Sequence, residues 1–256
     1  MKTKIFSIAL LLFISLLLIA AGYRCSGTRK TADSGQVETI MTNIDGKGIS
    51  IEVEFLKGES HNHPLLVIWL EDTDGRYIET LYIAESIGRG IFMHGDKSKG
   101  QWQAGPIRRP AALPYWGHQR GIREADGLYI PTSENPMPDA VTGPTPSGNF
   151  TLQSKSTDPT PAVFKLLLEI NQSWDWNEYW TNTKFPDDVD YKSSSQPAIV
   201  YEAVIDMNSG LKEFTMIPIG HSHYSGLDGS LDPDLSSLST ALQIVKSVTA
   251  VVETAK

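Results

Sequence analysis

Cysteine is almost absent from this sequence: its 256 residues contain a single one, Cys25. A disulfide framework and a four-thiolate zinc site are therefore both excluded. Basic residues are also few, because 22 Lys and Arg stand against 30 Asp and Glu, and the formal net charge is -8. Nucleic-acid binding needs clustered positive charge, so we expect no nucleic-acid partner.

Familiar catalytic motifs are missing as well. The sequence has no Gly-x-Ser-x-Gly elbow, no phosphate-binding loop and no Rossmann fingerprint. Carboxylates do cluster at 187–190, but Pro186 and the serines at 193–195 indicate a surface loop that would hold Ca²⁺ only loosely. These absences favour a protein without catalysis of its own.

What is present begins with the layout of a secretory signal peptide. A short basic start at 1–4 precedes an apolar run at 5–21, and Ala20, Ala21 and Gly22 supply the small residues of a cleavage site. We therefore expect residues 1–22 to be removed, residues 23–36 to form a linker, and the protein to be exported to the periplasm.

Two alternatives to cleavage stay open. The apolar run lies at the lower edge of a membrane-spanning length, so an uncleaved segment would anchor the chain in the membrane. Cys25 follows the run directly and would offer a lipid attachment site, although Tyr23 and Arg24 stand where lipoprotein signals have small residues. In either case the membrane contact is confined to this segment.

The rest of the chain is dominated by a period of two, which is typical of β-strands. Phe164, Leu166, Leu168 and Ile170 share one face, whereas 65–70 is apolar on both faces and indicates a central strand. Asp45-Gly46, Asp74-Gly75 and Asn208–Gly210 predict hairpin turns. The expected strands are 37–43, 49–56, 65–71, 76–85, 149–153, 163–171, 197–206, 211–219 and 247–253.

This pattern predicts an all-β fold, an immunoglobulin-like antiparallel β-sandwich in a single domain over 37–256. A jelly roll or an open barrel is the alternative. One stretch, 86–147, breaks the period and predicts a long irregular insertion, with a turn or two of helix within 109–118. Helical spacing of apolar residues predicts a short C-terminal helix within 234–245.

Several short motifs occur in an order that is similar to a known family. They are 68–72, 75–77 with 80–81, 139–146, 169–173 with 175–177, and 196–203. Together they resemble the exported bacterial family called domain of unknown function 2271, whose members are labelled predicted periplasmic proteins. The resemblance implies location and not activity. The hairpin at 74–81 is also similar to one in the immunoglobulin-like domain of flagellar hook-capping proteins.

The segment Asp139-Ala-Val-Thr-Gly-Pro-Thr145 resembles the acceptor motif of periplasmic flavin transferases, which join FMN to a threonine hydroxyl. The resemblance implies that Asp139, Thr142 and Gly143 are recognition residues and that Thr145 is the acceptor. Pro144 departs from the usual Ala. The alternative is a turn that leads into strand 149–153, with Asp139 and Thr142 bonding the loop backbone.

Four of the six histidines form two His-x-His pairs, His61 with His63 and His221 with His223. In an extended chain residues i and i+2 point the same way, so each pair has the spacing to chelate zinc or copper. The alternative is that both pairs lie solvated in polar loops.

Aromatic and arginine side chains supply a candidate contact surface for a ligand or partner. It comprises Trp102, Arg108, Arg109 and Trp116 in the insertion, and Trp174 and Trp176 after a strand. Planar cations beside rings suit an anionic or ring-shaped ligand, whereas the alternative is that the rings anchor the loop. We therefore expect a non-catalytic binding or accessory protein of the cell envelope. The alternatives are an FMN-modified carrier that serves a membrane redox partner and, more weakly, a histidine-based metal-binding protein.

Overall fold

The computed structural model describes residues 37–253. The predicted signal peptide, the linker and Cys25 lie outside this part of the chain. Within it, no helix is both long enough and apolar enough to span a bilayer.

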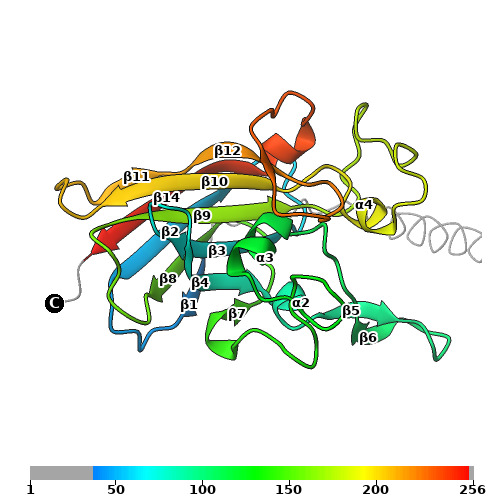
Figure 1. Ribbon diagram of the computed structural model, residues 1–256, viewed down its shortest axis with the longest axis horizontal. Helices are drawn as coiled ribbons and strands as arrows, with labels where there is room; N and C mark the ends of the chain where they lie inside the picture. The colour runs from blue at the N-terminus through cyan, green and yellow to red at the C-terminus, as the bar shows by residue number, and fades with distance from the viewer. Residues whose placement is uncertain (1–36, 254–256) are drawn as a thin grey trace, which may run out of the picture. The chain divides into compact units, whose positions relative to one another are not determined.

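Two sheets form the body of the protein (Figure 1). The smaller sheet has the order β1 (Glu38–Thr42), β8 (Phe150–Lys155), β2 (Ser50–Lys57), β14 (Val245–Glu253) and β11 (Glu213–Thr215). The larger sheet has the order β13 (Leu231–Asp232), β12 (Ile217–Ser222), β10 (Ile199–Asp206), β9 (Val163–Asn171), β3 (Leu65–Glu71), β4 (Tyr77–Ala84) and β7 (Thr142–Gly143). The predicted all-β sandwich is confirmed, and β3 and β9 have the expected bounds.

The main hydrophobic core lies between the two sheets. The smaller sheet contributes alternate residues such as Val53 and Phe55, and the larger sheet contributes Ile68, Leu168 and Phe164. Because side chains alternate along a strand, the remaining residues of β3 and β9 point to the other face of the larger sheet. That outer face is where the insertion lies.

The insertion forms a second layer over the outer face of the larger sheet. It contains α2 (Glu85–Gly88), the hairpin of β5 (Ile91–Asp96) and β6 (Gln103–Pro106), α3 (Pro114–Arg120), the 3₁₀ turn η1 (Asp139–Val141) and β7. Its apolar residues and those of the sheet make a second core, which includes Val67, Trp69, Leu113, Trp116 and Leu167. The short helix expected within 109–118 is present as α3, which begins at Pro114 and continues to Arg120.

Strand pairing departs from expectation at the N-terminal turn. The predicted hairpin at Asp45-Gly46 does not form, because β8 lies between β1 and β2 and pairs in parallel with β1. The pairing of Ile40 with Leu152 is non-local, so turn chemistry alone could not predict it. By contrast, the hairpin at Asp74-Gly75 joins β3 to β4 as predicted.

The predicted strand 211–219 also divides between the sheets. Its first part, β11, pairs with β14 of the smaller sheet, and the chain then continues into β12, which pairs with β10 of the larger sheet. The C-terminal helix is one 3₁₀ turn, η2 (Thr240–Gln243), and Leu238 reaches the main core from irregular chain before it. A further helix, α4 (Val189–Ser194), was not expected; its first turn is capped by the Asp188 side chain.

Candidate functional site

Arg109 joins the two regions that the sequence offers as contact surface. Its guanidinium carbon lies 4.5 Å from the ring centroid of Phe92 on β5. Its Nη1 donates a 2.6 Å hydrogen bond to Oγ of Ser173, in the loop after β9. Burial lowers the pKa of Arg109 from its usual value. The base of the β5–β6 hairpin and the start of the β9–α4 loop are thus held together, and Figure 1 shows both at one end of the molecule.

Each of the two segments that Arg109 links carries one exposed tryptophan. Trp102, beside the start of β6, is 60% exposed, and Trp174, next to Ser173, is 67% exposed. Trp174 also has a φ of 68°, a left-handed conformation that strains a bulky residue. We name Trp102, Arg109 and Trp174 the tryptophan surface. Backbone strain and an indole exposed to water both lower the stability of the folded protein, so a purely structural role does not explain Trp174.

Of the other predicted surface aromatics, Trp116 is buried and Trp176 is partly buried, which corrects the prediction. Trp116 on α3 is fully buried in the second core, and its Nε1 donates to Oγ1 of Thr80 at 2.9 Å. Trp176 packs against the main core, with its ring centroid 5.5 Å from that of Tyr191. The chain turns after β9 instead of staying extended, so Trp174 and Trp176 do not share a surface.

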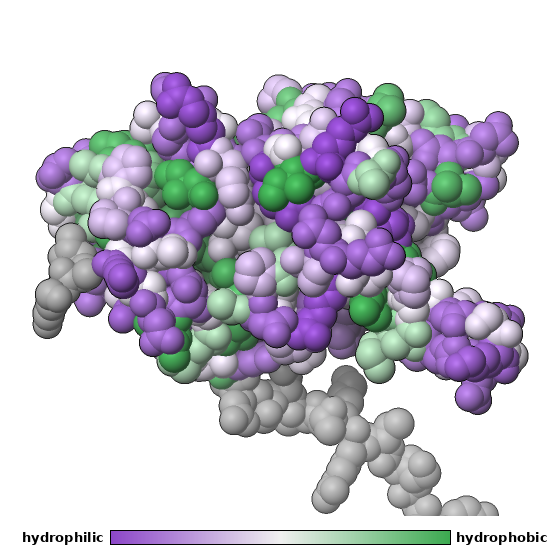
Figure 2. All heavy atoms as spheres, turned by 60° about the horizontal axis from the view of Figure 1, so that its bottom comes forward, coloured by the Kyte–Doolittle hydropathy of each residue, from purple (hydrophilic) through white to green (hydrophobic). Residues whose placement is uncertain are grey.

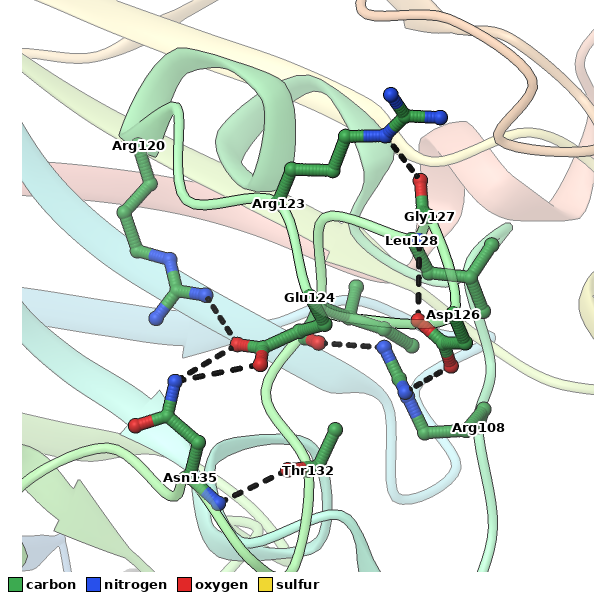
Figure 3. Close-up of polar contacts among 10 residues, drawn as sticks. Arg108, Arg120, Arg123, Glu124, Asp126, Gly127, Leu128, Thr132 and Asn135 are labelled. Carbon is green, nitrogen blue, oxygen red and sulfur yellow. Dashed lines mark hydrogen bonds and ion pairs between the residues drawn. The ribbon is translucent and has the colours of Figure 1, made fainter.

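Apart from Arg109, the arginines of the insertion hold the insertion itself together (Figure 3). Arg108 forms an ion pair with Asp126 and donates to the carbonyl of Ile130 at 2.7 Å. Arg120 lies over the ring of Trp116 and is only 5% exposed. Arg108, predicted as a ligand residue, therefore has an internal role, because irregular chain over a sheet needs side chains to bond its carbonyls.

Glu169 is the buried anchor of this layer. The carboxylate is completely buried and accepts the backbone N–H groups of Tyr115 and Trp116 at 3.1 and 2.8 Å, at the start of α3. Burial raises its pKa to about 8, and these N–H groups oppose the rise. The carboxyl group of Glu169, on the central strand β9, thus fixes α3 over the larger sheet. It lies on the face opposite Leu168, as the alternation predicts.

Residues of two predicted motifs meet in one polar network beside the tryptophan surface. The Asn171 side chain donates to the Gln196 carbonyl at 2.9 Å. The Gln196 amide donates to Asp175 O and Thr240 Oγ1 and accepts from Asn177 Nδ2 at 2.9 Å. Sequence reasoning missed this network, since only the polar residues after strand 163–171 hinted at it. The network shapes the β9–α4 loop that carries Trp174.

The candidate flavin segment forms an edge of the larger sheet. Asp139 forms an ion pair with Arg89 at 3.1 Å. Thr142 Oγ1 donates a hydrogen bond to the Asp139 carbonyl at 3.3 Å, so Thr142 bonds the loop backbone as the turn alternative expects. A Cβ on Gly143 would lie 2.7 Å from the ring of Tyr82, which explains the glycine by packing alone. Thr145 is half-buried, and within residues 37–253 its hydroxyl has no hydrogen-bond partner.

The two histidine pairs lie in different surroundings. His61 contacts the Phe55 ring edge-on at 5.8 Å. His221 is 8% exposed, which corrects its expected solvation, and its ring lies 6.2 Å from that of Trp180. His223 stacks on Tyr224 at 4.5 Å, and His63 is exposed. Within residues 37–253, no three His, Cys, Asp or Glu side chains gather to hold a metal ion, so neither pair is completed by a third ligand to hold zinc or copper.

Comparisons with protein-family models, with curated proteins and with solved structures found no match to this chain. The resemblance to domain of unknown function 2271 therefore stays a prediction.

Proposed function

We propose that this protein is an exported, non-catalytic binding protein of the cell envelope, and that it contacts its partner through the tryptophan surface. The observation that carries the proposal is the pair of exposed indoles in the two segments that Arg109 links, Trp102 at 60% and Trp174 at 67% exposure. Tryptophan and arginine are the side chains most enriched among residues that dominate binding energy at interfaces.

The support beneath this surface favours binding over simple loop packing. Arg109 is held by Phe92 and Ser173 before any partner arrives, so little side-chain entropy remains to be lost on binding. On the face drawn in Figure 2, hydrophobic residues form separate patches among hydrophilic ones. That face therefore lacks the continuous apolar area of a permanent interface. The partner we propose is a protein of the envelope, such as a membrane redox protein.

The proposal is tested by cross-linking the protein to its neighbours in the native envelope. Trp102→Ala and Trp174→Ala should each weaken capture of the cross-linked partner by about tenfold or more, the effect of losing a dominant interface residue. Leu211→Ala is the matched control, because Leu211 is 66% exposed in the turn between β10 and β11. Equal capture by all three variants would refute a contact through the tryptophan surface.

A second candidate function is an FMN-modified redox carrier, with the flavin on Thr145. The specific observation in its favour is the Thr145 hydroxyl, half-buried at the sheet edge and without a hydrogen-bond partner in the described chain. FMN would supply the redox chemistry, and Thr145 would only carry it. Pro144 in place of the usual Ala and the structural roles of Thr142 and Gly143 weigh against it.

Co-production with a flavin transferase distinguishes the two functions. A carrier would become yellow and gain the mass of one FMN, and the label would map to the peptide that contains Thr145. An unchanged mass and a colourless protein, with a known acceptor protein labelled in the same cells, would remove this second candidate.

A further inference from the structure

A lysine of the β9–α4 loop points its charge at three aromatic rings. The Nζ atom of Lys184 lies 3.1 Å from the ring centroid of Tyr179, 4.7 Å from that of Trp180 and 5.9 Å from that of Phe185. We name Tyr179, Trp180 and Phe185 the aromatic cage. Cations are attracted to the faces of such rings, most strongly to Trp.

The cage holds this cation without help from any carboxylate. Within residues 37–253 the ammonium group of Lys184 makes no ion pair, although Glu178, Asp187, Asp188 and Asp190 are close in the chain. Burial and the neighbouring Asp188 raise the pKa of Asp190. The contacts that hold the Lys184 ammonium group in the described chain are therefore those with the rings.

One wall of the cage is rigid and another is open. Trp180 is 6% exposed, and its Nε1 donates to Ser237 Oγ at 3.1 Å. Phe185 is stacked on Tyr224 at 4.1 Å. Tyr179, by contrast, is 56% exposed and borders a surface hollow that Asn177 and Ser236–Ser239 also line. A ligand can therefore reach the rings from the Tyr179 side without unfolding the core.

We propose that the aromatic cage is a binding site for a quaternary ammonium group, and that Lys184 occupies it as an intramolecular competitor. The three rings offer π faces, which suit a cation without N–H groups because it needs no acceptor oxygens. Lys184 does carry N–H groups, but its tether gives it a high effective concentration at the rings. The inference deepens the proposed function and rests on it in one respect, because the quaternary ammonium group would belong to the partner that also contacts the tryptophan surface.

The test uses choline as the probe and the tryptophan fluorescence of the purified protein as the readout. Wild-type protein should bind choline weakly, and Lys184→Ala should bind it about tenfold more tightly because the competitor is gone. Lys184→Met is the matched control, since a neutral side chain of similar length keeps the cage filled and should give no such gain. Adding Tyr179→Ala to Lys184→Ala should lose the gained affinity.

Two results would overturn the inference. One is a folded Lys184→Ala protein, checked by circular dichroism, that binds choline no better than the wild type. The other is equal binding of 3,3-dimethylbutan-1-ol, the uncharged analogue of choline, which would reveal an apolar pocket and no cation site. Cross-linking through Trp102 and Trp174 is measured separately, so failure of the cage would leave the proposed partner contact standing, and loss of that contact would leave choline binding measurable.

Discussion

The outer faces of the two sheets differ in almost every respect. On the smaller sheet, β2 turns Glu52 and Glu54 outward, and neighbouring β8 turns Thr151 and Gln153 outward; all are partly or fully exposed. On the larger sheet, the residues that face outward from β3 and β9 include Val67, Trp69 and Leu167, and none is exposed. One face is in water, whereas the other is the floor of a second core.

The difference explains why the insertion exists as a folded layer. A sheet with apolar residues on both faces must cover both, and 86–147 covers the outer one. This layer, which we call the cover, includes Arg109 and the base of the β5–β6 hairpin. The hairpin extends away from the sheets in Figure 1. The smaller sheet has no such layer. Of the two exposed indoles, Trp102 lies on the β5–β6 hairpin of the insertion and Trp174 lies in the loop that follows β9.

The largest effect that separates the two faces is expected at Trp69. Trp69→Ala should destabilise the protein by about 3–5 kcal/mol, because it opens a cavity in the second core. It also removes the Nε1 donor that bonds buried Glu71 at 2.8 Å. Glu54→Ala, on the exposed face of β2, should change stability by less than about 0.5 kcal/mol. Urea unfolding of both variants checks this; similar losses would contradict the contrast.

The second effect is a pH dependence that only the covered face should carry. The folded pKa of Glu169 is about 8 and its ordinary value is 4.5, so between these values folded protein holds a proton that the unfolded chain has released. The stabilisation is complete below about pH 4.5 and is lost as pH rises through 8. Each pKa unit corresponds to about 1.4 kcal/mol, so we expect a loss on the order of 3 kcal/mol between pH 5 and 8.

Glu169→Gln tests the source of that loss. The variant cannot titrate at this position, so its unfolding free energy should depend less on pH than that of the wild type. Its absolute stability should also fall, since the amide nitrogen of Gln would face a backbone N–H of α3. The slope of stability against pH is therefore the informative quantity, and parallel curves for the two proteins would show that Glu169 is not responsible.

The sequence predicts the position and the buried faces of several strands, but it predicts little of the candidate site. Alternation predicts that Leu168 and Glu169 lie on opposite faces, and the run 65–70, apolar on both faces, predicts a strand that is covered on both sides. Both predictions succeed because the burial pattern of a strand follows from its local sequence. The parallel partner of β1 was missed because that pairing depends on residues more than a hundred positions away. Strand identity is a local property, whereas strand order is not.

The tryptophans of the insertion show the same limit. Trp102 and Trp116 were both candidate contacts, yet one is exposed and the other is in the second core. Ala111, Ala112 and Leu113 before Trp116 give an apolar run that could have marked it as buried. The aromatic cage had no such signal, because the position of Lys184 over Tyr179 arises from the course of the β9–α4 loop.

A smaller effect is expected where the cover touches the sheet through one hydrogen bond. Trp116→Phe keeps a ring in the second core but removes the Nε1 donor to Thr80 Oγ1. Thr80 retains its bond with the Tyr77 hydroxyl at 2.8 Å, so we expect a loss of only about 1–2 kcal/mol. Urea unfolding measures it. A loss as large as that of Trp69→Ala would mean that indole shape, and not the hydrogen bond, holds the cover.

The smallest effect should come from Thr145, which follows β7 at the edge where the cover joins the larger sheet. Its hydroxyl has no hydrogen-bond partner within the described chain, so Thr145→Ala should change the free energy of unfolding by less than about 0.5 kcal/mol. If Thr145 carries FMN, the same variant abolishes the covalent flavin while the fold stays intact. A flavin that persists in Thr145→Ala would place the attachment elsewhere, and a marked loss of stability would give this threonine a structural role in the cover like that of its neighbour Gly143.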